Sequence, residues 1–187
     1  MTSSADLGSY RNPPDLDKGR GPAIRALWFL VNALVLQNRA NPSSAIRVLA
    51  LKLFGARIGP GALVRPGVNV KSPWHLTMGA NCWLGENVWI DSLAPITLGN
   101  NVCISQGAYL CCGNHDWTDP AFGKKVLPIT VEDGVWIATH AIILPGVVLR
   151  SHSVVAAGAV VTKDTEPYTV YAGNPAVAVK RRDLRKR

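Results

Sequence analysis

Aliphatic residues recur at every sixth position along most of the chain from Ile58 onward. The steps open with an aliphatic residue and often continue with a small one, as in "IGPGAL", "LGENVW", "LGNNVC", "ILPGVV" and "VAAGAV". Self-similarity of this kind indicates a repeat architecture and takes precedence over local propensity. A period of six predicts a triangular coil, in which each aliphatic residue points inward, a short strand follows and a small or turn-prone residue rounds the corner.

The distances between equivalent steps predict how the coils stack. Ile58, Met78 and Leu98 are 20 residues apart, and Val131 and Leu149 are 18 apart. Three steps of six make one coil of 18 residues, and short corner insertions account for the extra two. We therefore expect successive coils to pair as parallel strands around a continuous aliphatic column.

Two helices are predicted ahead of the repeats. Residues 24–36, "IRALWFLVNALVL", are apolar on nearly every face, but their 13 residues fall short of the roughly 20 that cross a bilayer. We expect this segment to pack on the end of the coil, and an interfacial membrane helix is the alternative. A second helix is predicted over residues 42–54, with Asn41 as its cap and with Ile46, Leu49 and Leu53 on one packed face.

One long insertion interrupts the repeats. Leu98 and Val131 are 33 residues apart where one coil needs 18, so about 15 residues must leave the coil as a protruding loop, residues 111–128. Long loops in compact domains are usually functional. This loop holds "CCGNHDWTDP", and its His115 lies outside the six-residue steps. The other histidines, His75, His140 and His152, fall near coil corners and are expected to be surface or corner residues.

Charge divides the chain into three parts. The net charge of +8 comes from basic ends: residues 1–55 carry seven basic and three acidic side chains, residues 56–179 seven and eight, and residues 180–187 six and one. We find no recognition motif or basic stripe on the repeats, so a nucleic-acid partner is not expected. Terminal basic charge suits acidic small molecules or a membrane surface better.

Composition and the first residues predict the number of folded units and the cellular location. With 187 residues, 48% of them apolar, the chain is expected to fold as one unit with appendages. Its start has no basic-then-apolar leader, which predicts a cytoplasmic protein. The four cysteines form no CxxC pair, so reduced thiols are expected.

Three chemical interpretations of the loop remain to be compared. Cys112 precedes His115 by three residues and could be a nucleophile, although a buried small hydrophobe is the commoner fate of cysteine. A metal site needs three or four convergent ligands, and the loop offers neither a CxxC knuckle nor an HxxxH pair, so no metal is expected. A lone histidine base is the third interpretation.

The runs "LGNNVCISQGAYL", "EDGVWIATHAIILPGVVLRSHSVVAAGAVVTKD" and "YAGNPAVAVKR" resemble the hexapeptide-repeat acyltransferases, particularly the sugar O-acetyltransferases. The fuller run from Leu53 to Pro120 is similar to the acetyltransferases of colanic-acid and exopolysaccharide biosynthesis. The resemblance covers about residues 50–182. It implies a mainly β fold, a left-handed parallel β-helix, assembled as a homotrimer with sites between subunits. On this basis residues 1–55 form a polar arm and a helical segment, 56–172 the β-helix, and 173–187 a "GNPA" turn and a basic tail.

The resemblance also implies an activity, the direct transfer of an acetyl group from acetyl-CoA to a saccharide hydroxyl. The family's catalytic histidine occupies this loop, so His115 is the expected general base, which removes the hydroxyl proton. The donor groove implied by the resemblance would be lined by Trp136, Thr139, Ala157, Thr162 and Lys163, with Lys180 or Arg181 reaching a phosphate.

The acceptor side is less closely matched. Alignment through "LGNN" puts Gly85 where the family has a substrate-binding asparagine, which leaves Asn87 and Asp91 as substitutes. Asp116 could hold the imidazole of His115 or simply make a turn. Alternative functions are acetyl transfer to an amine or a serine, and a non-catalytic β-helix that binds a partner or a metal. Peripheral contact with the inner face of the membrane through residues 24–36 also remains open.

Overall fold

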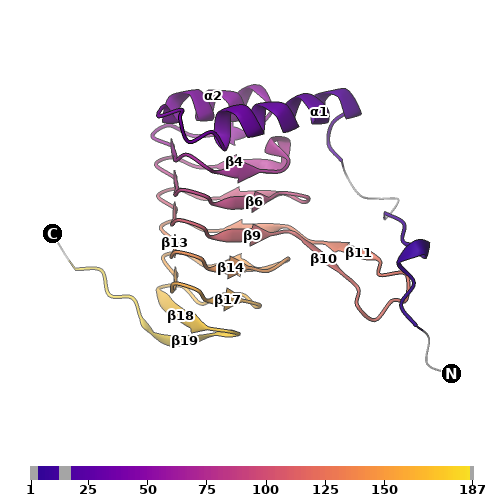
Figure 1. The fold of residues 1–187 in the computed structure, drawn as a ribbon. Helices are drawn as coiled ribbons and strands as arrows, with labels where there is room; N and C mark the ends of the chain where they lie inside the picture. Colours follow the sequence, from indigo (N-terminus) through magenta and orange to yellow (C-terminus); the bar gives the residue numbers. More distant parts are fainter. Residues whose placement is uncertain (1–3, 13–17, 186–187) are drawn as a thin grey trace.

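The computed structural model describes residues 4–12 and 18–185, and it forms a triangular coil with three sheets of mainly parallel strands as its sides (Figure 1). The remaining parts of the expected polar arm and basic tail, residues 1–3, 13–17 and 186–187, lie outside the described residues. Two helices cover one end of the coil, a hairpin projects from its side, and the chain finishes at the other end. The expected mainly β architecture is confirmed.

Each coil contributes one short strand to each sheet. Sheet A is made of β1 (Arg57–Ile58), β4 (Leu76–Met78), β7 (Ile96–Leu98), β12 (Ile129–Val131) and β15 (Val148–Leu149). Sheet B is made of β2 (Leu63–Val64), β5 (Trp83–Leu84), β8 (Cys103–Ile104), β13 (Trp136–Ile137), β16 (Val154–Val155), β18 (Thr169–Gly173) and β19 (Ala176–Arg181). Sheet C is made of β3 (Asn69–Val70), β6 (Trp89–Asp91), β9 (Tyr109–Cys111), β14 (Ile142–Ile143) and β17 (Val160–Val161).

The register in sheet A is the one that the spacing predicts. Ile58 pairs with Met78, Met78 with Leu98, Leu98 with Val131 and Val131 with Leu149, all in parallel. These inward side chains are at most 9% exposed. Because every coil places an aliphatic residue at the same point, the core is a column that continues from coil to coil.

Corner positions explain two of the histidines. His140 and His152 have positive φ angles of 56° and 58°, the left-handed conformation that turns the chain at a corner. A glycine lies beneath each ring: a Cβ on Gly107 would lie 2.4 Å from the imidazole of His140, and one on Gly134 would lie 2.6 Å from that of His152. Both histidines are therefore corner residues, as the repeat pattern predicts.

The two predicted helices form, with different bounds. Helix α1 (Pro22–Val31) continues into a π-helical turn, η2 (Asn32–Leu36), and helix α2 spans Ser44–Leu53. The predicted cap of α2 is wrong. Its cap is Ser43, whose hydroxyl accepts a hydrogen bond from the Ile46 amide at 3.3 Å, while the Asn41 side chain accepts one from the Ser43 amide in the preceding turn. The 3₁₀ turns η1 (Leu7–Ser9) and η3 (Pro73–His75) complete the helical elements of the described residues.

These helices close the exposed edge of the first coil. The Trp28 indole donates to the Val70 carbonyl at 2.8 Å, and the Ser44 hydroxyl accepts from the Val64 amide at 2.8 Å. The buried Arg47 guanidinium donates to the carbonyls of Val64 and Asn41, and its burial lowers the pKa of this side chain. An uncovered strand edge is a template for aggregation, so the helices protect β2 and β3.

The outer surface of the helix pair differs from the expectation. Ile46, Leu49 and Leu53 were expected to be packed, but they are 51%, 56% and 75% exposed. The buried face of α2 carries Arg47, Ala50 and Leu51 instead, because the strand edge beneath it needs hydrogen-bond donors as well as apolar cover. In the described ranges, no helix has both the length and the hydropathy needed to cross a membrane.

At the other end of the coil the chain folds back on itself. Strand β18 pairs in parallel with β16, and β19 returns antiparallel along β18, with Gly173 opposite Ala176. The predicted "GNPA" turn is thus confirmed. It brings Lys180 and the residues after it back beside sheet B.

Candidate active site

The insertion that carries His115 is a β-hairpin, where the sequence predicts only a loop. Strand β10 (Gly113–His115) pairs antiparallel with β11 (Lys124–Val126), with His115 opposite Lys124. The hairpin leaves the coil after β9 and rejoins it before β12, and the Leu127 amide closes its base by donating to the Cys112 carbonyl at 3.0 Å. The backbone pairing holds His115 on an ordered arm that projects from the coil (Figure 1).

A backbone carbonyl fixes the imidazole of His115. Its Nδ1 lies 2.8 Å from the carbonyl oxygen of Phe122, and the two rings are stacked with centroids 4.4 Å apart and planes 9° apart. A carbonyl only accepts hydrogen bonds, so Nδ1 must carry the proton. The neutral ring then has its lone pair on Nε2, the arrangement that a general base needs.

Asp116 does not orient this ring, which decides one alternative left open by the sequence. Its carboxylate lies 2.8 Å from the ammonium of Lys125 and accepts hydrogen bonds from the hydroxyl and the amide of Thr118. Lys125 and then Thr118 hold the pKa of Asp116 well below its usual range. Asp116 therefore shapes the tip of the hairpin, and the Phe122 carbonyl has the orienting role.

Asp91 lies at the root of the hairpin. It is buried on β6, opposite Cys111 of β9, and its carboxylate is 2.9 Å from the ammonium of Lys71 and 3.4 Å from the hydroxyl of Tyr109. Burial, and then the proximity of Cys111 and Asp91, raises the pKa of Tyr109. A carboxylate held by a lysine and a phenol at this point can accept from a substrate hydroxyl, but it makes no bond with His115 among the described contacts.

Asn87 occupies a different place from the one its candidate role requires. It lies ahead of β6, at the opposite end of the strand from Asp91, with a positive φ of 58°. Its side-chain oxygen accepts a hydrogen bond from the Arg39 guanidinium at 3.0 Å. The asparagine turns a coil corner and contacts Arg39, between η2 and α2, so the structure does not bring it to the hairpin.

Cys112, at the base of the hairpin, is a poor nucleophile. Cys112 is fully buried, and burial raises the pKa of its thiol to about 12. Cys111 donates from its Sγ to the Gly113 carbonyl at 2.9 Å. Thiol chemistry requires an accessible thiolate, which Cys112 does not supply. Across residues 4–12 and 18–185 there is also no group of three or more ligand side chains that could hold a metal ion.

A residue that sequence reasoning missed lies against the imidazole. Tyr10, from the N-terminal arm, has its ring centroid 5.9 Å from that of His115, and the Asp6 amide donates to the Pro120 carbonyl at 2.8 Å. The arm thus contacts the tip of the hairpin from more than 100 residues away in sequence. The segment around Tyr10 is polar and has no periodicity, so no pattern in it indicated this contact.

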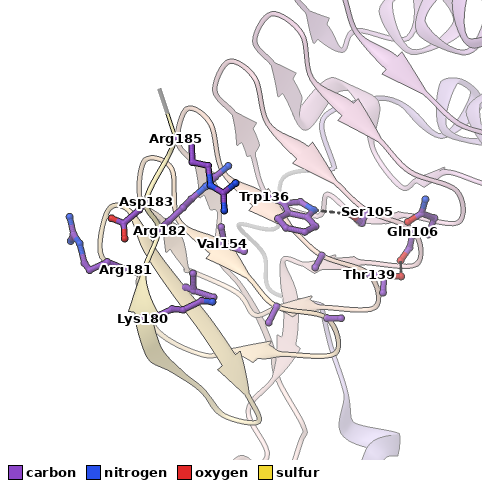
Figure 2. Close-up of a pocket in the computed structure, with 14 residues that line it drawn as sticks. Ser105, Gln106, Trp136, Thr139, Val154, Lys180, Arg181, Arg182, Asp183 and Arg185 are labelled. Carbon is purple, nitrogen blue, oxygen red and sulfur yellow. Dashed lines mark hydrogen bonds between the residues drawn. The ribbon is translucent and has the colours of Figure 1, made fainter. Parts of the chain in front are cut away.

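A groove of about 1010 Å³ runs along the outer face of sheet B. Figure 2 shows Trp136 lying across it, with its indole nitrogen donating to the Ser105 hydroxyl at 2.9 Å, and Thr139 bonded to the Gln106 carbonyl at 2.7 Å. The side chains of Lys180, Arg181, Arg182, Asp183 and Arg185 gather at one end. Strand surface along its length and cations at one end suit a long ligand with phosphates.

The groove includes some of the residues expected to bind the donor. Of those predicted, it is lined by Trp136, Thr139, Ala157, Lys180 and Arg181. Thr162 and Lys163 are not among its lining residues, because they follow β17 of sheet C, around the next corner of the coil.

Arg182 and Arg185 also line the groove, and sequence reasoning assigned them to a solvated tail. The Arg182 guanidinium donates to the carbonyls of Gly134 and His152 at 2.8 Å and 3.1 Å. These bonds fasten the chain after β19 to the side of the coil.

The hairpin and the groove lie on different sides of one chain. The groove belongs to sheet B, whereas the hairpin leaves at the corner between sheets C and A, and Figure 1 shows the hairpin and the C-terminal segment on opposite sides of the coil. One chain therefore does not bring His115 to the groove.

Comparison with known proteins identifies this architecture. The family model described as the hexapeptide repeat of succinyl-transferase matches residues 76–112 and 128–163, and the gap between the matches contains the hairpin. The Escherichia coli (strain K12) protein named as the colanic acid biosynthesis acetyltransferase WcaF is 34% identical over 177 residues, 95% of this chain and 97% of its own. The chain belongs to the hexapeptide-repeat acyltransferase family.

Two further relatives extend this assignment. The galactoside O-acetyltransferase of Escherichia coli (strain K12) is 31% identical over 76% of this chain and 72% of its own. A hexapeptide-repeat acetyltransferase of Vibrio cholerae, crystallised with acetyl-CoA, superposes with a TM-score of 0.81 at 25% identity and covers 91% of this chain and 93% of its own. As a hexapeptide-repeat acyltransferase, the chain has the left-handed parallel β-helix of that family.

Proposed function

We propose that this acyltransferase moves an acetyl group from acetyl-CoA directly to a saccharide hydroxyl, with His115 as the general base. The observation that carries the proposal is the hydrogen bond from His115 Nδ1 to the Phe122 carbonyl, which leaves Nε2 as the basic nitrogen. The names of two relatives support the acceptor class, one for colanic acid biosynthesis and one for galactoside O-acetylation. The first of these names favours an exopolysaccharide precursor as the acceptor.

His115 would act twice in the reaction. Its Nε2 accepts the proton of the saccharide hydroxyl while that oxygen attacks the thioester carbonyl carbon. When the carbon–sulfur bond breaks, the imidazolium returns the proton to the departing sulfur. The products are the O-acetyl saccharide and free CoA, and the enzyme carries no acetyl group between the two steps.

The groove on sheet B is the proposed site of the donor. Trp136 offers an apolar surface to the pantetheine arm, and the neighbouring strand edges near Thr139 and Ala157 offer backbone hydrogen bonds. Lys180 and Arg181 provide cations for the phosphates.

We also propose a homotrimer, in which the hairpin of one subunit covers the groove of the next. The separation of His115 from the groove within one chain supports this assembly. Asp91, at the root of the hairpin, would meet the acceptor in the same cleft. A cytoplasmic location follows from the supply of acetyl-CoA.

Release of free CoA across a panel of sugars, amines and serine tests this function. We expect release with particular saccharides, and a loss of about 10²–10⁴ in kcat for His115→Gln, which keeps an amide in place of the ring but removes the base. Lys125→Ala is the matched control, because it alters the same hairpin and leaves the bond between His115 and Phe122 in place.

Two results would oppose the proposal. Transfer to amines alone would replace the acceptor class and leave the donor and the base unchanged. A loss smaller than tenfold in His115→Gln, with the hairpin folded, would remove His115 from the role of general base.

A further inference from the structure

Helices α1 and α2, together with η2, form a helical cap that presents an apolar surface at the end of the coil. The apolar cap face comprises Leu27, Phe29, Leu30, Leu34, Leu49 and Leu53, which are 54% to 75% exposed. Both helices lie across the same end of the coil, away from β18 and β19 (Figure 1). Folded monomers rarely expose apolar patches of this extent unless the patch binds something.

The inner side of the same helices is bonded to the first coil. Trp28 is buried and bonds to the Val70 carbonyl, Asn32 is buried and bonds to the Val70 amide, and Arg47 bonds to the Val64 carbonyl. The helices therefore cannot rotate to bury the apolar cap face without breaking the cover of β2 and β3. The polar contacts beneath the helices therefore keep the leucines on the outer surface.

The positive charge near these helices favours an anionic partner. From Lys18 to Lys52 the sequence has six basic residues, of which Arg47 is buried, and no acidic one. Lys52 is exposed on α2 beside the apolar cap face, and Lys18 and Arg20 are exposed just ahead of α1. A second copy of the chain would bring the same positive charge to the contact, whereas an anionic partner with an apolar interior satisfies both the charge and the leucines.

We propose that the apolar cap face binds the surface of an anionic lipid bilayer. The helices would lie in the plane of the interface, with the leucines among the acyl chains and the basic residues at the headgroups. This inference goes beyond the acetyl transfer proposed above and does not depend on it, because it rests on the cap and on neither His115 nor the groove.

The proposed contact sets the orientation of the coil and the distance between the hairpin and the bilayer. The hairpin leaves the third strand of sheet C, so about 20 Å separate it from the bilayer, given a coil spacing of about 4.8 Å and a helix layer of about 10 Å. The long axis of the coil would stand on the membrane, with its C-terminal end pointing away.

Flotation of the full chain with vesicles tests the proposal. We use vesicles of phosphatidylcholine alone and vesicles with added phosphatidylglycerol, and we expect binding to the anionic vesicles that weakens as salt is raised. A triple variant, Leu27→Gln, Leu30→Gln and Leu34→Gln, should bind about a hundredfold more weakly, since each leucine contributes roughly a factor of five on burial.

The chain offers a matched control at its other end. Val177, Val179 and Leu184 are 58%, 54% and 56% exposed, so replacing these three with glutamine removes a comparable amount of apolar surface. We expect this variant to bind like the native chain. Lys52→Glu tests the charge separately and should weaken binding to anionic vesicles about tenfold, and circular dichroism checks that each variant is folded.

Three outcomes would overturn the proposal. The native chain could remain unbound with anionic vesicles, or the two triple variants could lose binding equally. The native chain could also remain lipid-free while the leucine variant sediments at a lower mass, which would show that a second copy covers the apolar cap face.

Discussion

Replacing Cys112 with alanine tests whether acetyl transfer is direct. Burial raises the pKa of this thiol from an ordinary value of 9.0 to about 12. At pH 7 the thiolate fraction is then about 10⁻⁵, against about 10⁻² at the ordinary pKa of 9.0. A nucleophile at this position would therefore be reactive for a very small part of the time, although it lies only three residues from His115.

We expect kcat/KM of Cys112→Ala to stay within about threefold of the native value, because the proposed mechanism uses no protein nucleophile. The substitution removes one fully buried sulfur, which should cost about 1 kcal/mol and lower the Tm by about 2–4 °C. The assay combines CoA release with the intact mass of enzyme quenched during turnover. Cys111→Ala, at the half-buried neighbouring position, is the control.

An acetyl adduct on Cys112 in the quenched enzyme would refute the direct mechanism. A loss of a hundredfold or more in kcat/KM, with the Tm no lower than expected, would do the same. Burst release of CoA ahead of steady turnover would be the kinetic form of that result.

Three other predictions concern the hairpin, the groove and the cap. Asp116→Asn should change kcat by less than about threefold, because its carboxylate holds Lys125 and Thr118 and makes no bond to the imidazole; steady-state kinetics check this. Trp136→Ala should raise the KM for acetyl-CoA about tenfold with a smaller effect on the KM for the acceptor, measured by varying each substrate in turn. Arg47→Met should lower the free energy of unfolding by about 2–4 kcal/mol in urea titrations, because the carbonyls of Val64 and Asn41 lose their buried donor; an unchanged midpoint would show that the apolar contacts of methionine compensate.

Cys112 also predicts a dependence of stability on alkaline pH. Its pKa is higher in the folded chain than its ordinary value, so folding favours the neutral thiol. This contribution is complete below about pH 9 and is lost as the pH rises toward 12, with about 1.4 kcal/mol gone by pH 10. Urea midpoints measured from pH 8 to pH 10 should fall for the native chain, and a fall of equal size in Cys112→Ala would contradict the assignment.

The repeats were predictable because one physical requirement recurs in every coil. An inward aliphatic residue at each sixth position determines which strands pair, so the distances among Ile58, Met78 and Leu98 give the register directly. The turn at Gly173 was predictable for a similar reason, since its residue types favour that turn. The insertion that carries His115 was also predictable, because it interrupts the six-residue spacing of the repeats.

The details of the site depend on contacts that leave no periodic trace. The partner of His115 is a backbone carbonyl, that of Phe122, which any residue would have supplied, and its position follows from the hairpin pairing. Tyr10 reaches the imidazole from an aperiodic arm. On α2 the apolar pattern predicted the wrong buried face. The strand edge beneath the helix requires hydrogen-bond donors, which Arg47 supplies and which a pattern of apolar residues does not indicate.

The closure of the hairpin at its base has a consequence for how such enzymes diversify. The Leu127 amide meets the Cys112 carbonyl at 3.0 Å, so the two ends of the insertion lie side by side, and β7 pairs with β12 as if nothing separated them. The insertion is thus a cassette, which can be lengthened, shortened or exchanged while the coils above and below keep their register. Under the proposed function, acceptor preference and donor binding can then evolve separately, one on a replaceable arm and the other on the wall of a repeating scaffold.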